Sequence, residues 1–194
     1  ADILLIPLAL GQKVWFEPGE GPRLGQLPPT EALREAVEGS TAKLANIGET
    51  LARVRAQLEP ERALIGFAGA PWTVATYMLE GRGSQREAAR TYAYEHPEAL
   101  DALLDVLVDA TARYLVMQAR AGAQALQIFE SWAENLAEDV FGRIVIEPHR
   151  RIIEQVRAAG VDTPFIGFPR AAGALVENYA AQVPVQGVAL DTQA

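Results

Sequence analysis

The sequence lacks cysteine entirely and has only two histidines among its 194 residues. Without cysteine there is no disulfide bond, no thiolate nucleophile and no cysteine-ligated zinc, and a reducing cytoplasm is the compartment that fits. Long hydrophobic runs are missing as well, since none approaches the roughly 18–20 residues of a membrane span. The opening ADILLIPLALG has no basic n-region and does not resemble a signal peptide. We expect a globular cytoplasmic protein that does not bind membranes.

Positively charged side chains are also outnumbered: 17 Lys and Arg face 25 Asp and Glu, giving a formal net charge of −8 and a pI of about 4.8. Nucleic acids and anionic membranes are polyanions, which such a protein repels except at local clusters of Arg and Lys. Nucleic acid is therefore not an expected partner. The hydrophobic share of 49% is that of an ordinary globular protein.

The motifs of several common enzyme classes are absent too. The chain has no GxSxG elbow, no P-loop, no HExxH and no GxGxxG. His96 and His149 each adjoin a proline at a predicted helix start, so we expect capping or surface positions for them rather than catalytic ones. No metal site is expected.

What the chain does contain is an alternation of short apolar runs and longer amphipathic segments. The short runs are nearly continuous in hydrophobicity, which is typical of parallel strands covered on both faces. The expected strands are 64–69, 125–131, 164–168 and 185–190, the expected helices are 41–58, 97–121 and 148–159, and a small hairpin around Pro18 and Gly19 is expected within 12–29.

This alternation predicts an α/β protein made of βα units. A closed (β/α)8 barrel typically needs about 250 residues, and both ends of this chain resemble the middle of structured segments. We therefore expect a single TIM-barrel domain over residues 1–194 that is incomplete at both ends and holds about five of eight βα units. A doubly wound open sheet is the alternative.

Ligands of α/β proteins gather at the carboxyl ends of the strands. That rule selects Gly69 to Trp72 with Tyr77, Glu130 to Trp132, Phe168 to Arg170, Asp191 with Thr192, and Asp2 if a strand ends just before it. Each has an ordinary structural interpretation: Ser131 as a helix cap, Tyr77 as core, Glu130 and Arg170 as an ion pair. These residues alone predict a ligand-binding α/β enzyme of unknown reaction.

A family resemblance narrows this prediction. The stretch GFAGAPWTVATYMLEGRGS closely resembles the signature that uroporphyrinogen decarboxylases carry after their third barrel strand. The segments ADILLIPLALG, ALQIFESWAENL, FIGFPRAAG and GVALDTQ are similar to the family's motifs at strands two, four, five and six. Ala1 and Thr192 depart from the residues usual in the family. The family's N-terminal arginine motif and C-terminal histidine motif have no counterpart in this sequence.

The resemblance implies a cofactor-free carboxy-lyase. Such an enzyme converts the four acetate side chains of uroporphyrinogen III to methyl groups and gives coproporphyrinogen III on the route to haem. It also implies a homodimer of (β/α)8 barrels, of which this chain would supply strands two to six. Asp2 matches the aspartate that contacts the pyrrole N–H groups at the substrate's centre, while Tyr77 and Ser131 match residues that line the cleft.

Two further expectations concern the surroundings of this cleft. Gly66, Gly69 and Ala70 would let the backbone lie close beneath a broad tetrapyrrole, and Arg82 and Arg170 are candidates to offset its many carboxylates. Two alternatives remain open. One is a corrinoid-dependent methyltransferase of the same superfamily, which would need His and Cys ligands for zinc. The other is a non-catalytic binding protein on the same fold.

Overall fold

The centre of the fold is a parallel sheet whose strands follow one another in chain order. The computed structural model describes residues 2–83 and 86–192. Its main sheet has four strands in the order β3-β4-β5-β6: β3 (Ile65–Gly69), β4 (Ala125–Glu130), β5 (Phe165–Pro169) and β6 (Gly187–Val188). Because every strand pairs in parallel with the next one along the chain, the order is that of a barrel wall and shows no reversal of a doubly wound sheet.

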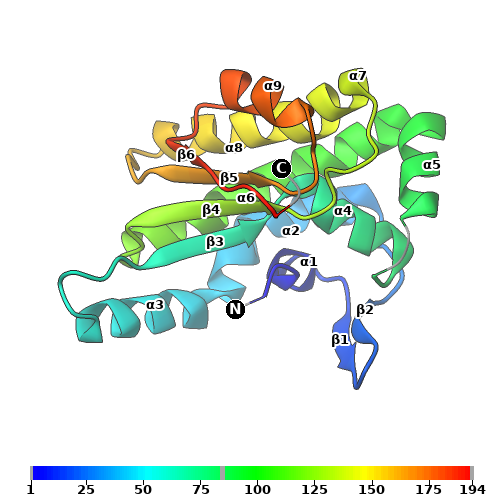
Figure 1. Cartoon of the computed structure of the whole chain (residues 1–194). Coiled ribbons are helices and arrows are strands. Elements are labelled where there is room, and N and C mark those ends of the chain that lie inside the picture. Colours follow the sequence, from blue (N-terminus) through cyan, green and yellow to red (C-terminus); the bar gives the residue numbers. More distant parts are fainter. Residues whose placement is uncertain (1, 84–85, 193–194) are drawn as a thin grey trace.

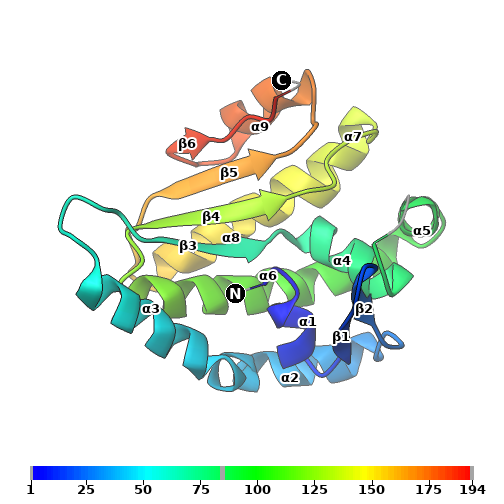
Figure 2. The same cartoon turned by 60° about the horizontal axis from the view of Figure 1, so that its bottom comes forward.

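The connecting helices lie along the outside of this sheet. Figure 2 shows the strands on the inner side of an arc of helices, with α8 behind the sheet and α6 below β3. The helices are α1 (Leu5–Ala9), α2 (Thr30–Lys43), α3 (Ala45–Gln57), α4 (Pro71–Glu80), α5 (Glu87–Glu95), α6 (Pro97–Arg120), α7 (Glu138–Phe141), a π-helical turn (Gly142–Ile146), α8 (Glu147–Ala158) and α9 (Leu175–Gln182). This arrangement of βα units confirms the expected α/β partial barrel.

The predicted helices agree with the structure in two of three places. Helices α6 and α8 confirm the expected segments 97–121 and 148–159. The expected helix over 41–58 is instead divided at Leu44 between α2 and α3. None of the residues of α3 is fully buried, because it lies at the end of the arc, as Figure 2 shows, and has a packing neighbour on one side only among the described elements.

The hairpin near the N-terminus is confirmed. Strands β1 (Val14–Glu17) and β2 (Gly21–Leu24) pair in antiparallel fashion, and Gly19 adopts a positive φ of 78° in the turn between them. The Leu24 amide donates to the Gly81 carbonyl at 2.7 Å, which ties the hairpin to the end of α4. Within the part of the chain that the structure describes, no helix has the length and hydrophobicity needed to cross a membrane.

The two faces of the sheet differ, contrary to the expectation of strands covered on both faces. Leu126, Ile128 and Phe165 are fully buried on the face that α6 and α8 cover. On the other face Phe67, Phe129 and Phe168 are half-buried and pack edge to face, with ring centroids 5.7 and 5.8 Å apart. The face without helices is the inner side of the arc, which a closed barrel would fill with side chains from its remaining strands.

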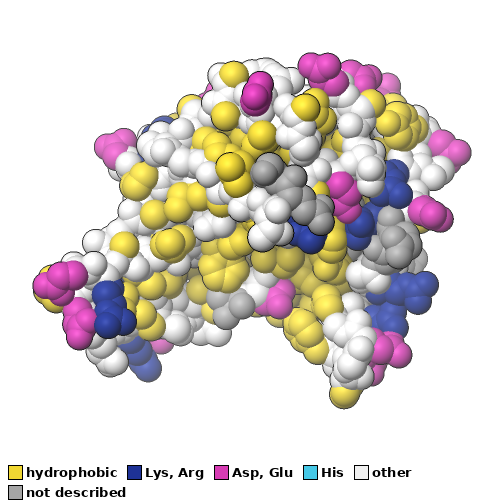
Figure 3. All heavy atoms as spheres, in the orientation of Figure 1, with side chains coloured by type: hydrophobic (Ala, Val, Ile, Leu, Met, Phe, Trp, Pro, Cys, Tyr) yellow, Lys and Arg dark blue, Asp and Glu magenta, His cyan; other side chains and the backbone are white. Residues whose placement is uncertain are grey.

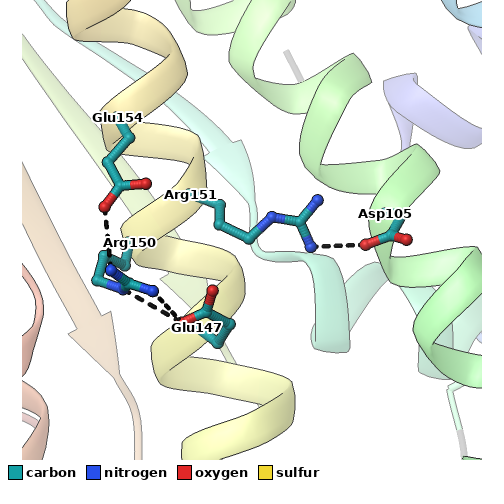
Figure 4. A network of polar contacts seen from close by, with 5 residues as sticks. All are labelled: Asp105, Glu147, Arg150, Arg151 and Glu154. Carbon is teal, nitrogen blue, oxygen red and sulfur yellow. Dashed lines mark hydrogen bonds and ion pairs between the residues drawn. The ribbon is translucent and has the colours of Figure 1, made fainter.

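A row of polar contacts joins α6 to the helix that follows β4. Carboxylates four residues apart on one face of α6 meet side chains of the neighbouring segment: Asp101 with Arg143, Asp105 with Arg151 and Asp109 with Gln155, at 2.5, 2.5 and 2.6 Å. Figure 4 shows Arg151 reaching from α8 across to Asp105, whereas Arg150 stays on α8 between Glu147 and Glu154. Such half-exposed contacts contribute less than about 1 kcal/mol each, so they align the helices more than they stabilise the fold.

Helix α6 also holds the backbone of strand β3. The buried Gln118 side chain accepts a hydrogen bond from the Phe67 amide at 2.9 Å and donates one to the Phe67 carbonyl at 2.8 Å. A side chain at Gly66 would collide with this arrangement, because its Cβ would lie 2.8 Å from the Gln118 Oε1 atom. Glutamine and glycine thus form one unit that fixes β3 against the helix layer.

We predict that Gln118→Leu lowers the free energy of unfolding by about 2 kcal/mol, because both polar groups of Phe67 lose their partner. Urea denaturation of the full-length protein measures the change. Gln57→Leu on the exposed end of α3 is the matched control, and we expect it to change stability by less than about 0.5 kcal/mol. Equal effects of the two substitutions would show that the contact with Phe67 contributes nothing.

Candidate functional site

Helix α4 begins at the carboxyl end of β3 and carries several side chains of the candidate site. Strand β3 ends at Gly69, and Pro71 occupies the first helical turn, where its missing N–H costs nothing. Helix α4 then ends at Gly81, which adopts a left-handed φ of 71°. This short helix places Thr73 and Tyr77 on neighbouring turns beside the end of β4.

Helix α4 holds the turn that follows β4 from two sides. The Ser131 amide donates to the Thr73 Oγ1 atom at 2.8 Å. The buried Trp72 indole donates to the Trp132 carbonyl at 2.9 Å. Because both donors and acceptors are fixed by packing, the position of Ser131 at the edge of the sheet is set by α4 as well as by its own strand.

Tyr77 lies in a cluster with Trp132 and Arg86. The Tyr77 and Trp132 rings are 6.1 Å apart, and the Arg86 guanidinium lies 4.0 Å from the centre of the Trp132 ring. Arg86 also forms an ion pair with Glu134. The sequence reasoning missed Arg86, which stands just beyond the glycine-rich run GRGS, and favoured Arg82 within it. A cation beside an aromatic pair at a strand end has no short sequence signature, because the residues come from separate segments.

Asp2 enters the same region from the N-terminus. Its Oδ1 atom accepts a hydrogen bond from the Leu4 amide at 2.7 Å, which orients the half-buried carboxylate. The adjoining Ile3 packs against the end of β3, where its carbonyl oxygen lies 3.0 Å from the position of a Cβ at Gly69. Figure 1 shows α1 below the end of β3. The segment after Asp2 is a turn leading into α1.

The pKa of Tyr77 shows that these groups interact. Burial raises the pKa of the phenol above its usual value, the Arg86 cation lowers it, and the Asp2 carboxylate raises it. Asp2 and Arg86 therefore act on the phenol with opposite sign. Since Ser131 adjoins Trp132, the structure places Asp2, Tyr77 and Ser131, which the sequence selects from different segments, around one edge of the sheet.

The other selected residues have different environments. Arg82 and Arg170 are exposed, and the Asp191 Oδ2 atom accepts the Ala171 amide at 2.5 Å, which joins the ends of β5 and β6. Glu130 contacts Thr73 and His149 through its carboxylate rather than pairing with Arg170. Figure 3 shows hydrophobic side chains over the strands and cationic ones toward the side of α4 and α5.

Two further expectations were wrong. The glycines at 66 and 69 do not leave room for a ligand, because Gln118, Val74 and Ile3 occupy the space that their side chains would fill. His149 is not a capping or surface residue: it is fully buried, with its ring nitrogens facing Tyr179 and Glu130. His96 is exposed at the start of α6, as expected.

Within the described ranges, no group of three or more His, Cys, Asp or Glu side chains is arranged to hold a metal ion. A groove of about 770 Å³ lies between α2, α3, α6 and α8. It reaches Arg120 and Ala159, which precede β4 and β5, so it is on the side of the strands' amino ends and away from the candidate site.

A family model and several relatives match this chain and have the same name. The sequence model described as uroporphyrinogen decarboxylase (URO-D) matches residues 1–194. Relatives with the name uroporphyrinogen decarboxylase include proteins of Phenylobacterium zucineum (strain HLK1), Caulobacter vibrioides (strain NA1000 / CB15N) and Maricaulis maris (strain MCS10). They are 77%, 65% and 53% identical to this chain and cover 100%, 100% and 99% of it. The chain spans 55–56% of the length of these relatives.

A solved structure of a methyltransferase from Methanosarcina mazei resembles the fold. The TM-score is 0.63, with 96% of this chain and 54% of the methyltransferase chain covered, but the sequence identity is 15%. A likeness at this identity shows a shared architecture alone.

The interaction of Asp2 with Tyr77 gives a prediction for the titration of the phenol. Asp2→Asn removes the negative charge that disfavours the phenolate, so we expect the pKa of Tyr77 to fall while burial keeps it above its usual value. Arg86→Gln removes a positive charge, so we expect the pKa to rise. NMR titration of labelled tyrosine in the full-length protein measures both shifts, with the exposed Asp162→Asn as the control. An unchanged Tyr77 pKa in Asp2→Asn would show that the Asp2 carboxylate does not act on the phenol.

Proposed function

Because this chain belongs to the uroporphyrinogen decarboxylase family, we propose that the protein decarboxylates the acetate side chains of uroporphyrinogen III to give coproporphyrinogen III. The match of all 194 residues to the family carries this proposal, and relatives of that name are up to 77% identical among those given above. The convergence of Asp2, Tyr77 and Ser131 on one edge of the sheet supports it. The substrate, the complete reaction and the roles below belong to the proposal.

The chemistry requires a carboxylate near the pyrrole nitrogens. Loss of CO2 from an acetate arm leaves a carbanion, which is stabilised if a proton has first been added to the neighbouring pyrrole carbon and has made the ring cationic. The electron pair of the broken C–C bond then moves to the cationic ring and leaves an exocyclic methylene. A second proton converts this methylene to the methyl group, and loss of the first proton from the ring carbon restores the pyrrole. Asp2 would accept the pyrrole N–H hydrogen bonds and oppose the transient positive charge.

The magnitude of this interaction is limited. Two unit charges 4 Å apart attract by about 4 kcal/mol at an effective dielectric constant near 20, whereas enzymes lower barriers by roughly 8–23 kcal/mol. Positioning of the substrate and a proton donor supply the remainder. The hydrogen bond from the Leu4 amide leaves the other oxygen of Asp2 to accept the substrate's N–H groups.

Side chains around Asp2 would hold the substrate's carboxylates. The hydroxyls of Tyr77 and Ser131 are donors at the sheet edge. Arg86 would supply a local positive charge beside them, which would attract a substrate carboxylate in a protein whose net charge of −8 repels anions. We further propose that the protein is a homodimer in the cytoplasm that needs no cofactor.

We predict that Asp2→Asn in the full-length protein removes most turnover while KM for uroporphyrinogen changes by less than about tenfold. Asparagine keeps the shape of the side chain but lacks its charge. We therefore expect the substitution to weaken the stabilisation of the cationic transition state more than the binding of the substrate. Absorbance of the oxidised products measures the rate. Asp162→Asn, on the exposed side of the loop before β5, is the control with unchanged activity. A kcat near that of the unmodified protein would refute the role of Asp2.

For Tyr77→Phe we expect a smaller loss of kcat/KM, corresponding to about 1–3 kcal/mol, because one hydroxyl contact to the substrate is lost. The same assay measures it. Tyr94→Phe on exposed α5 is the matched control. If Tyr77→Phe and Tyr94→Phe were equally active, the Tyr77 hydroxyl would have no part in substrate binding.

A further inference from the structure

A chain of fully buried polar side chains runs through the helix layer to the candidate site. Tyr179 of α9, His149 of α8, Glu130 of β4 and Thr73 of α4 are each 0% exposed. The Tyr179 hydroxyl and the His149 Nδ1 atom are 2.7 Å apart, and the His149 Nε2 atom lies 3.4 Å from the Glu130 Oε2 atom. Thr73 joins the other carboxylate oxygen of Glu130 to the Ser131 amide.

The hydrogen bonds among these four side chains fit the following assignment of donors and acceptors. A carboxylate only accepts, so the Thr73 hydroxyl donates to Glu130 and its oxygen is left to accept the Ser131 N–H. On the other side, a His149 ring that carries its proton on Nε2 donates to Glu130 and accepts from Tyr179 at Nδ1. Burial raises the pKa of Tyr179, and the Glu130 charge adds to this, so the phenol keeps the proton that it donates.

Strand β5 provides the space for this chain. A Cβ at Gly167 would lie 2.6 and 2.8 Å from two carbons of the Tyr179 ring, closer than side chains approach one another. The glycine in FIGFP is therefore required by the phenol that packs against it. The Tyr179 and His149 rings meet edge to face with centroids 5.4 Å apart, which fixes both orientations.

A buried carboxylate is an expensive way to fill space between a sheet and its helices. Removing a charge from water costs several kcal/mol after relaxation, and well-packed apolar side chains are often at least as stabilising. The role of Glu130 is to orient the Thr73 hydroxyl, which in turn holds the amide of Ser131. Catalytic geometry is sensitive to displacements of this kind, since a 1 Å error costs up to about a hundredfold in rate.

We propose that Thr73 and Glu130, supported by His149 and Tyr179, are positioning residues that set where the Ser131 hydroxyl lies against the substrate. The inference rests on the proposed function in so far as Ser131 contacts substrate. Thr73 is the residue to substitute, because its hydroxyl links the Glu130 carboxylate to the Ser131 amide.

The test compares three threonine variants of the full-length protein. Thr73→Val removes the bridging hydroxyl and keeps the shape, so we expect kcat to fall by about tenfold or more with KM within about threefold. Thr73→Ser keeps the hydroxyl, so we expect this variant to retain the activity of the unmodified protein. Thr111→Val is the matched control, because Thr111 is equally buried on α6 and its hydroxyl has no hydrogen-bond partner among the described residues.

A double-mutant cycle separates positioning from general packing. If Thr73 acts through Ser131, Thr73→Val adds no further loss of kcat in a Ser131→Ala background. Additive losses would overturn the proposal, as would a Thr73→Val protein as active as Thr111→Val. Tyr179→Phe removes the hydroxyl that contacts His149, which is the group of this hydrogen-bonded series farthest from Ser131. We expect this substitution to lower kcat a few-fold. A folded Tyr179→Phe protein with normal kcat would remove His149 and Tyr179 from the proposal.

Hydrogen exchange of the Ser131 amide tests the same contact without activity. We expect faster exchange in Thr73→Val than in Thr73→Ser or Thr111→Val. If the protein shows this exchange pattern but does not turn over uroporphyrinogen, the proposed function is refuted, while the contact between Thr73 and the Ser131 amide is supported. An active protein whose Ser131 exchange is the same in all variants would overturn the inference alone.

Discussion

The hydroxyl of Thr73 joins two neighbouring strands of the sheet at the edge where the candidate site lies. It donates to Glu130 at the end of β4 and accepts from the Ser131 amide one residue later. Trp72 adds a second contact to the same turn. Because Pro71 starts α4 directly after β3, these contacts tie the end of β3 to the end of β4. The positions of Ser131 and Trp132, and through the Trp132 ring those of Tyr77 and Arg86, depend on this connection.

A cation lies at the candidate site of a chain whose net charge is negative. The net charge is −8, yet a guanidinium lies beside the phenol and indole at the edge of the sheet. A local cation acts strongly on a bound anion because half-buried groups are screened less than exposed ones. Glu134 holds Arg86 in place, while Asp2 acts on the same phenol from the other segment. Under the proposed function, Asp2 would face the positive centre of the substrate and Arg86 would face its carboxylates.

Buried polar groups divide into two kinds in this fold. Gln118 fixes the backbone of β3 to α6, and its role follows from pairing the polar groups of Phe67. Glu130, His149 and Tyr179 pair chiefly with one another between the sheet and the helices α8 and α9. The first kind stabilises an element of the fold. The second keeps an expensive charge in the interior, where it orients a single hydroxyl at the site.

The sequence determined the order of the βα units, helices α6 and α8, the hairpin and the family, because these depend on local periodicity, turn residues and a long contiguous motif. The carboxyl ends of parallel strands, which meet at one edge of the sheet, gave a longer set of candidate residues, and the family resemblance selected Asp2, Tyr77 and Ser131 from it. Only the tertiary structure decided what fills the space at Gly66 and Gly69, where His149 lies, and that Arg86 rather than Arg82 lies beside Tyr77. Each of these depends on contacts between segments far apart in the chain, and periodicity along one segment carries no information about the side chains that another segment brings against it.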